Sequence, residues 1–232
     1  MNILDKINYN IADPSGMLKA ITSFPTSAKK AIKNLEKSEI KLDGKNYSSI
    51  LVAGMGGSAV GGLLLRDWLF DTLKIPIIVS RGYHLPAWAN KKTLVYAVSY
   101  SGNTEETLTQ YAEAVERGCT IICFCSGGKL AEKARENYQT LILFPQGHQP
   151  RAAIPYQFYS LAGVTRKIGF IEELKWVEVE ESIEVVEKLC TEMVPETPAE
   201  SNNAKQLALK IVYKIPFIYA PRLFESVAYR YS

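Results

Sequence analysis

Short apolar runs alternate with longer amphipathic stretches along the first two thirds of the chain. The apolar runs predict five strands, at residues 49–53, 75–79, 93–98, 120–125 and 140–144. The stretches between them predict helices at about 58–70, 104–117 and 128–136. Each strand is a nearly continuous apolar run, which is typical of a parallel sheet covered on both faces. The pattern therefore predicts an α/β fold with a doubly wound, five-stranded parallel sheet.

Helices are predicted on either side of this alternating region. Residues 16–38 predict one or two helices with a break near Pro25. After residue 151 the pattern becomes mostly helical, with helices predicted at 153–168, 179–193 and 203–213. Residues 194–203, between the last two, are polar, contain two prolines and are typical of a linker.

The last residues predict one more strand, at 216–220, and one more helix, at 222–231. This layout resembles that of residues 49–66, which indicates an internal repeat whose second copy is incomplete. A single strand and helix cannot bury both faces of a sheet. Either the strand joins the first sheet or the chain is the front part of a longer protein, and we favour the second interpretation.

Composition and charge narrow the function classes. The net charge is +3 with no basic block, so nothing favours nucleic acid or an acidic membrane surface as a partner. No apolar run approaches the roughly 18 residues of a membrane span, and the first residues lack a signal-peptide pattern. We therefore expect a cytoplasmic protein, in which the four cysteines are reduced core thiols.

The most informative polar stretch is Ser99-Tyr-Ser-Gly-Asn-Thr-Glu-Glu106. It follows the predicted strand 93–98 and opens the next predicted helix. The start of a helix offers free backbone N–H groups and a positive dipole end to an anion. The hydroxyls of Ser99, Ser101 and Thr104 therefore predict a phosphate-binding turn. A helix cap alone would explain Asn103 and the glutamates.

A second unusual loop, Gly54-Met-Gly-Gly-Ser58, follows the first predicted strand. Its glycines allow backbone amides to approach a ligand closely. In a sheet of strand order 2-1-3-4-5, the ends of strands one and three flank the crevice where ligands bind. If that order holds, the two loops converge on one phosphate-type site.

The first loop also fits a dinucleotide-binding fingerprint, because Gly54-x-Gly56-x-x-Ala59 matches G-x-G-x-x-A. That fingerprint needs an acidic residue at the end of the second strand, where this chain has Arg81. An arginine there is compatible with a 2′-phosphate, so an NADP-dependent oxidoreductase remains an alternative. A dinucleotide site gives no reason for the hydroxyls at 99–104.

These motifs resemble those of sugar isomerase (SIS) domains. A third motif, Gly147-His-Gln-Pro-Arg151-Ala-Ala, is similar to the G-x-x-P-R-A motif of the archaeal-type bifunctional phosphoglucose/phosphomannose isomerases. The resemblance runs from about residue 15 to the end and includes Glu225-Ser-Val-Ala-Tyr-Arg230. It implies an N-terminal SIS domain with leading helices over residues 1–150. Residues 151–232 would then form a helical connection and the start of a second, truncated SIS domain.

The resemblance also implies roles for individual residues. Gly57 and Ser58 would contact the sugar near its reacting end. Ser99, Ser101 and Thr104 would hold its 6-phosphate. Arg151 would face C1 and C2 and stabilise an enediolate with its fixed positive charge.

Proton transfer between C2 and C1 also needs a base. In the family a glutamate in an Asn-Glu-Asn run supplies it, while a histidine and a C-terminal lysine assist ring opening. None of these motifs occurs in this sequence. His84 and His148 are expected to be structural loop residues, and Glu105 and Glu106 lie too close to the expected phosphate to be the base.

The resemblance thus implies an isomerase that interconverts glucose 6-phosphate or mannose 6-phosphate with fructose 6-phosphate through a cis-enediol. It implies no metal and no organic cofactor, and it implies a homodimer that binds sugar 6-phosphates. This chain is expected to bind substrate without the base. A non-catalytic sugar-phosphate sensor is an alternative from another class of protein.

Overall fold

The computed structural model describes residues 3–36, 38 and 40–231. Five strands form one all-parallel sheet in the order β2-β1-β3-β4-β5, which confirms both the fold class and the strand order that brings the two loops together. The strands are β1 (Ser49–Ala53), β2 (Ile77–Ser80), β3 (Thr93–Val98), β4 (Thr120–Cys125) and β5 (Thr140–Leu143).

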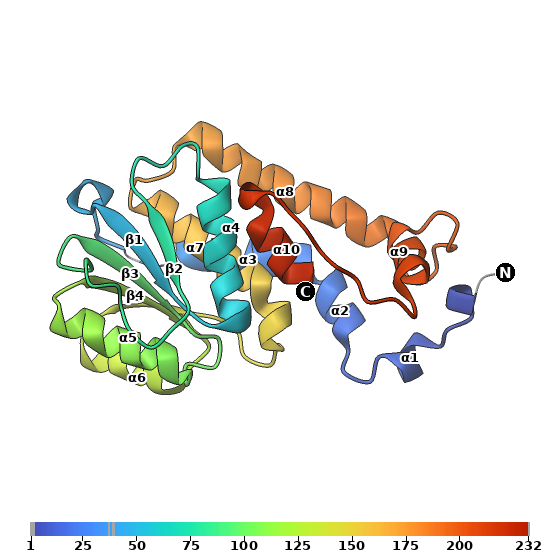
Figure 1. Cartoon of the computed structure of the whole chain (residues 1–232), viewed down its shortest axis with the longest axis horizontal. Helices are drawn as coiled ribbons and strands as arrows, with labels where there is room; N and C mark the ends of the chain where they lie inside the picture. The colour runs from blue at the N-terminus through green and yellow to red at the C-terminus, as the bar shows by residue number, and fades with distance from the viewer. Residues whose placement is uncertain (1–2, 37, 39, 232) are drawn as a thin grey trace.

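Helices cover both faces of this sheet (Figure 1). The helices are α1 (Tyr9–Ala12), α2 (Met17–Thr22), α3 (Phe24–Glu36), α4 (Gly56–Trp68), α5 (Glu105–Glu116), α6 (Gly128–Glu136), α7 (Ile154–Lys167), α8 (Glu173–Glu192), α9 (Asn203–Ile211) and α10 (Glu225–Tyr231). Short 3₁₀ turns lie at η1 (Ile3–Asp5), η2 (Gly44–Asn46), η3 (Pro150–Ala153) and η4 (Arg222–Phe224). Figure 1 shows α5 and α6 on one face, with α3, α4 and α7 on the other.

The core is divided by the sheet into two apolar clusters. Alternate residues of each strand point to opposite faces, so Val52 and Tyr96 join one cluster while Leu51 and Val95 join the other. The larger cluster also includes buried side chains of α3, α7 and α8. The connection after residue 150 therefore packs directly on the first sheet.

Several predicted boundaries differ from the structure, and three of the differences have a clear physical reason. β2 begins at Ile77, because Pro76 has no N–H to donate to a ladder. The break in the first helical region falls at Ser23, with Pro25 inside the first turn of α3, where a proline is tolerated. α8 begins at Glu173 rather than at 179, and its first turns bury Trp176.

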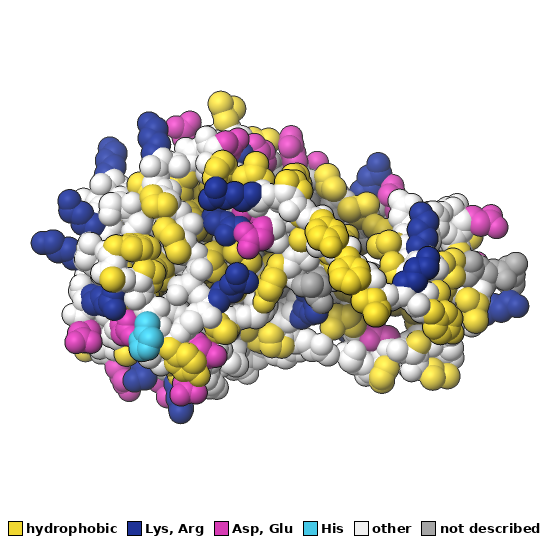
Figure 2. Space-filling view, viewed as in Figure 1, with side chains coloured by type: hydrophobic (Ala, Val, Ile, Leu, Met, Phe, Trp, Pro, Cys, Tyr) yellow, Lys and Arg dark blue, Asp and Glu magenta, His cyan; other side chains and the backbone are white. Residues whose placement is uncertain are grey.

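The predicted strand at 216–220 is wrong. These residues make no sheet pairing with the described strands and run as an exposed stretch between α9 and α10 (Figure 1). The side chain of Phe217 is 78% exposed and that of Tyr219 is 89% exposed, and Figure 2 shows hydrophobic side chains on the surface over this stretch. A strand needs a neighbour to pair with its backbone, and this segment lies away from both edges of the sheet.

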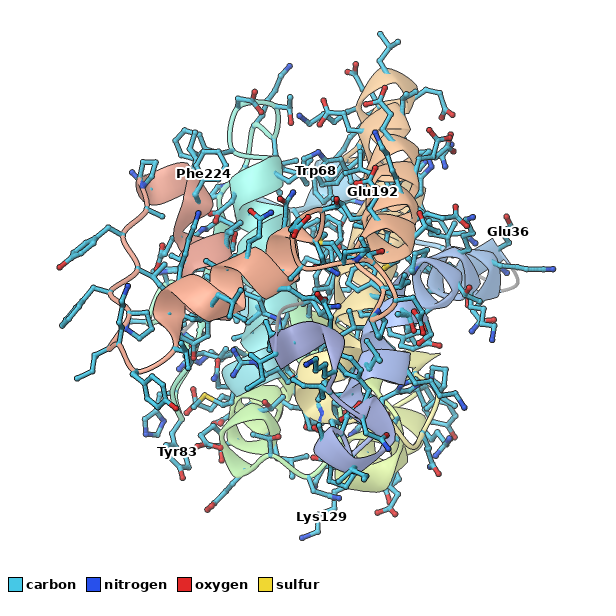
Figure 3. All side chains as sticks on the ribbon, turned by 90° about the vertical axis from the view of Figure 1, so that its right-hand side faces the viewer. Glu36, Trp68, Tyr83, Lys129, Glu192 and Phe224 are labelled. Atoms are coloured by element: carbon cyan, nitrogen blue, oxygen red, sulfur yellow. The ribbon has the colours of Figure 1, made fainter. Side chains whose placement is uncertain are left out.

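The reason lies in where α10 docks. Glu225 forms an ion pair of 2.8 Å with Arg66, and the backbone N–H of Ser226 donates to Asp67 Oδ2 at 3.1 Å. These contacts join the start of α10 to the end of α4. The other end of α10, at Arg230, lies with Gly56 and Gly57 at the start of α4, so the two helices run antiparallel. Figure 3 shows Phe224 on the opposite flank of the molecule from Glu36, the last residue of α3. The C-terminal segment therefore follows the outer side of the helical layer and not the sheet.

Candidate substrate-binding site

The loops after β1 and β3 meet at the carboxyl edge of the sheet. The backbone N–H of Tyr100 donates to Ser58 Oγ at 3.2 Å. A Cβ added to Gly54 would lie 3.1 Å from the carbonyl oxygen of Val98, so glycine permits this close approach. The predicted convergence of the two loops is present in the structure.

Ser99 forms the inside of the turn between β3 and α5. Its side chain is fully buried, and its Oγ lies 2.8 Å from Thr104 Oγ1 and accepts the backbone N–H of Gly102 at 3.1 Å. Gly102 has φ of 71°, and a Cβ there would lie 1.8 Å from the carbonyl oxygen of Gly127. Ser99 and Gly102 therefore set the shape of the turn.

Thr104 and Ser101 lie on the outer side of the same turn. Thr104 is the N-cap of α5, and its side chain makes no capping hydrogen bond there. The opening turn of α5 thus presents backbone N–H groups that have no intrahelical acceptor. Ser101 is exposed, and its Oγ accepts the backbone N–H of Asn103 at 3.2 Å. This arrangement can bind an anion through N–H and hydroxyl donors.

Negative charge also lies beside this turn. Glu105 and Glu106 occupy the first turn of α5, where their negative charges interact favourably with the positive end of the helix dipole. Their charges, with Glu105 first, raise the pKa of the neighbouring Tyr83. Figure 3 labels Tyr83, on the loop that follows β2. The turn therefore has donors and acidic side chains within one short stretch.

The third motif, Gly147 to Ala153, reaches the same place. A Cβ on Gly57 would lie 3.1 Å from the carbonyl oxygen of Pro150, so η3 packs directly on the glycine loop. The hydroxyl of Tyr100 donates to the carbonyl oxygen of Pro145 and accepts the backbone N–H of His148, both at 2.8 Å. Burial raises the pKa of Tyr100. One tyrosine therefore ties the phosphate-type turn to the third motif.

An open cleft of about 510 Å³ lies beside these contacts. It is lined by Gly56, Gly57, Val60, Gln149, Pro150, Arg151, Tyr229 and Arg230. Arg151 is exposed and donates from Nη2 to the carbonyl oxygen of Arg230 at 2.8 Å. Of the predicted site residues, Gly57 and Arg151 line the cleft, whereas Ser58 is buried behind the glycine loop and Ser99, Ser101 and Thr104 lie on the neighbouring turn.

Sequence reasoning missed Gln157, which lies on α7 and is fully buried. Its Nε2 donates to Ser58 Oγ at 3.4 Å, and its Oε1 has no hydrogen-bond partner among the described residues. The available signal was an amide side chain on a predicted helix whose other buried residues are apolar or carry only a hydroxyl. Gln157 thus supports Ser58 from the core side.

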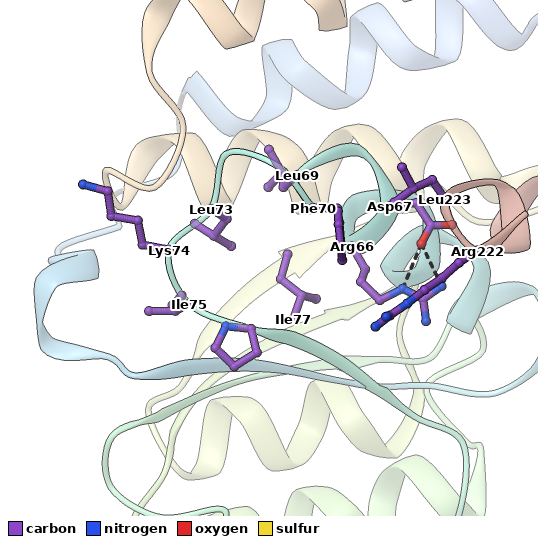
Figure 4. Close-up of a pocket in the computed structure, with 11 residues that line it drawn as sticks. Arg66, Asp67, Leu69, Phe70, Leu73, Lys74, Ile75, Ile77, Arg222 and Leu223 are labelled. Atoms are coloured by element: carbon purple, nitrogen blue, oxygen red, sulfur yellow. Dashed lines mark hydrogen bonds and ion pairs between the residues drawn. The ribbon is translucent and has the colours of Figure 1, made fainter.

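A separate pocket of about 240 Å³ lies at the other end of α4 (Figure 4). Its lining includes Leu73 and Ile77, with Arg222 stacked over Phe70 at 5.4 Å. Arg66 at its rim already pairs with Asp67 at 2.7 Å. None of the three sequence motifs contributes to this pocket.

The remaining titratable candidates have structural partners. His84 is exposed, and its Nδ1 lies 2.5 Å from Glu113 Oε1. The ring of His148 packs 5.2 Å from that of Tyr156. Among residues 3–36, 38 and 40–231, no group of three or more His, Cys, Asp or Glu is placed to hold a metal ion.

Two further expectations concerned the state of the cysteines and the presence of a membrane-spanning segment. All four cysteines are free, and three of them are buried as expected, whereas Cys190 is only partly buried and does not belong to the core. Burial raises the pKa of the Cys123 thiol. Within the described part of the chain, no helix combines the length and apolar character that crossing a membrane requires. Neither observation adds a reactive group to the site.

Comparison with known proteins matches residues 45–149 to the SIS domain model. Over 203 residues the chain is 41% identical to a bifunctional phosphoglucose/phosphomannose isomerase of Caldicellulosiruptor bescii. The match covers 88% of this chain and 60% of that protein. It is 40% identical over 121 residues to a D-glucosamine-6-phosphate 4-epimerase of Sulfolobus acidocaldarius, covering 52% of this chain and 38% of that one.

Solved structures support the fold. A hypothetical protein from Thermus thermophilus aligns with a TM-score of 0.61 and 18% identity over 85% of this chain and 48% of its own. The chain spans about 60% of the length of the Caldicellulosiruptor relative. Residues 45–149 are therefore similar to the SIS domain, and most of the chain is similar in sequence to the bifunctional phosphoglucose/phosphomannose isomerases.

Proposed function

We propose that this protein is a sugar-phosphate aldose–ketose isomerase. It would interconvert glucose 6-phosphate or mannose 6-phosphate with fructose 6-phosphate through a cis-enediol. The observation that carries the proposal is the meeting of three motif loops, from residues 54–58, 99–104 and 147–153, around Tyr100 and Gly57. The names of the relatives that match over most of the chain support it.

In this proposal the turn after β3 binds the 6-phosphate. The N–H groups at the start of α5 and the hydroxyls of Ser101 and Thr104 would donate to the phosphate oxygens. Ser99 contributes through its buried Oγ, which holds Thr104 and Gly102 in place. A dianion at a helix start needs no lysine, because dipole and backbone donors act together.

The reacting end of the sugar would lie in the cleft between the glycine loop and η3. Gly57 and Ser58 would contact it from the sheet side, and Arg151 would face it from η3. Negative charge develops on the C1 and C2 oxygens as the enediolate forms, and a guanidinium stabilises that charge. The proposal requires no metal or organic cofactor, and it assigns the proton-transferring base to no residue of this chain.

The chain organisation is part of the proposal. Residues 1–150 would form the N-terminal SIS domain with its leading helices. Residues 151–232 would form a helical connection and the start of a second SIS domain. The match to the SIS domain ends at residue 149, which supports the boundary between the two parts.

We further propose that the protein is a cytoplasmic homodimer. Four free cysteines support a reducing compartment. Exposed apolar side chains on η1, α1 and α9 support a partner surface, among them Ile3 at 73%, Ile11 at 77% and Leu207 at 46% exposure. Light scattering of the purified chain tests the assembly, and a monomer at all accessible concentrations contradicts it.

A thermal-shift measurement with fructose 6-phosphate, run beside one with NADP, tests the proposed ligand. A ligand at a hundred times its Kd adds about 2.7 kcal/mol to the free energy of unfolding, which raises the midpoint by several degrees in a chain of this size. A shift with fructose 6-phosphate alone supports the proposal. A shift with NADP alone assigns the Gly54 loop to a dinucleotide.

The double variant S99A/T104A places the binding at the turn. It is expected to abolish the shift with fructose 6-phosphate. T109A is the matched control, because Thr109 lies on the same helix and its hydroxyl donates to the carbonyl oxygen of Glu105 at 3.0 Å. No turnover is expected from this chain, because none of its residues is assigned as the base, and turnover at the rate of an isomerase would contradict that assignment.

A further inference from the structure

The cleft beside the glycine loop contains two guanidinium groups rather than one. Arg230 Nη2 donates to the carbonyl oxygen of Arg151 at 2.8 Å, and Arg151 Nη2 donates to the carbonyl oxygen of Arg230 at the same distance. Each guanidinium has five N–H donors, so one reciprocal bond leaves the others available. Both side chains line the cleft together with Gly56 and Gly57.

The two positive charges are not neutralised by the protein around them. Among the residues that the structure describes, neither guanidinium has a carboxylate within ion-pair distance. Burial, and then the charge of Arg151, lower the pKa of Arg230. Arg66, at the other end of α4, provides the contrast, because Asp67 and Glu225 both pair with it. Like charges placed together in a cleft form a favourable environment for an anion.

Arg230 lies in the cleft because the helix that carries it packs on α4. Arg66 and Asp67, at the end of α4, hold the first residues of α10. Because the two helices run antiparallel, the end of α10 lies beside Gly56 and Gly57, where α4 begins. The docking of α10 therefore delivers a second arginine to the cleft.

We propose that Arg230 is a second anion-binding residue of this cleft and that, with Arg151, it binds the oxygens at the reacting end of the sugar phosphate. This rests on the proposed function. The 6-phosphate would stay on the turn at 99–104, so that the substrate meets positive groups at both ends. The pair would favour ligands whose reacting end is negatively charged, as the enediolate is.

Two sugar phosphates that differ at one end test this. The reacting end of 5-phospho-D-arabinonate is a carboxylate, and that of sorbitol 6-phosphate is a neutral alcohol. In R230Q, calorimetry is expected to show affinity for the arabinonate about tenfold lower, the size of one lost hydrogen bond to a charged group, and affinity for sorbitol 6-phosphate within about twofold of the parent. R230K, which keeps the charge, is expected to retain most of the arabinonate affinity.

R222Q is the matched control, because it removes the same charge from the same C-terminal segment, at the pocket on the far end of α4. Equal affinities for R230Q and R222Q overturn the inference, and so does an equal loss for both ligands in R230Q. R230K as weak as R230Q for the arabinonate also overturns it. If the unaltered protein binds neither sugar phosphate, the proposed function itself has failed.

Discussion

Two segments of the chain share the layout of an apolar run followed by a helix, but only the first apolar run forms a strand. Residues 49–68 form β1 and α4, and the strand is fully buried between β2 and β3. Residues 216–231 carry an equally apolar run before a helix, yet the run makes no sheet pairing and most of its side chains are exposed. Strand propensity is therefore not sufficient, because a strand exists only where neighbours accept its backbone hydrogen bonds.

The two helices after these runs differ in the same way. α4 packs on the sheet with buried residues such as Leu63 and Leu65. α10 buries Ser226 alone among its described residues and is held at its start by polar contacts to α4. The first unit builds the core, and the second is attached to it.

The largest effect on stability is expected at Gly102, in the turn after β3 that lies beside the first segment. G102A places a methyl group 1.8 Å from the carbonyl oxygen of Gly127 and forces a φ of 71° on an alanine. We expect a loss of about 3 to 5 kcal/mol in the free energy of unfolding, since both a clash and backbone strain act. Urea denaturation measures it. G118A is the control, with a φ of 67° and nothing within 4 Å, and should cost about 1 kcal/mol.

Alanine at matched apolar positions compares the two units directly. I50A removes a fully buried side chain from β1 and should cost about 2 to 4 kcal/mol, because a cavity remains in the core. I218A acts on a side chain that is 41% exposed and should cost less than about 0.5 kcal/mol. Similar losses of stability in both variants would show that residues 216–220 are buried in solution.

The next effect in size is expected from weakening the contacts that attach α10 to α4. D67N weakens the carboxylate that accepts the N–H of Ser226 and pairs with Arg66. We expect about 1 kcal/mol of local destabilisation, seen as faster hydrogen exchange in α10 with unchanged exchange in the sheet. D71N, on the loop after α4, serves as the control. Equal acceleration in sheet and helix would mean that α10 belongs to the core's cooperative unit.

The smallest effect concerns acidification of the loop after β2. The hydrogen bond from His84, and then that from the backbone N–H of Leu85, lower the pKa of Glu113 below 4.5. A carboxylate with a lowered folded pKa stabilises above its ordinary pKa, and that contribution is lost as the pH falls through the folded value. Hydrogen exchange around residues 82–90 should therefore quicken slightly below about pH 4. In E113Q this step should be absent, whereas E116Q should keep it.

Local pattern was enough for most of the sheet. The strands at 49–53, 93–98 and 120–125 begin and end as predicted, because continuous apolar runs bounded by polar turns have few alternatives. The start of α8 at Glu173 was not predicted, since Trp176 is buried by contact with distant helices. The same limit explains the error at 216–220.

The sequence by itself determined the fold class and the three loops that carry chemistry, because these depend on periodicity and on glycines and hydroxyls at strand ends, whereas the strand order was an assumption that the structure confirmed. The tertiary structure alone decided the inward position of Ser99, the support of Ser58 by Gln157 and the pairing of Arg151 with Arg230. Each of these joins side chains through packing between elements, and no local pattern records which elements will touch. Residues 151 and 230 are 79 positions apart, and they meet because α10 docks antiparallel on α4.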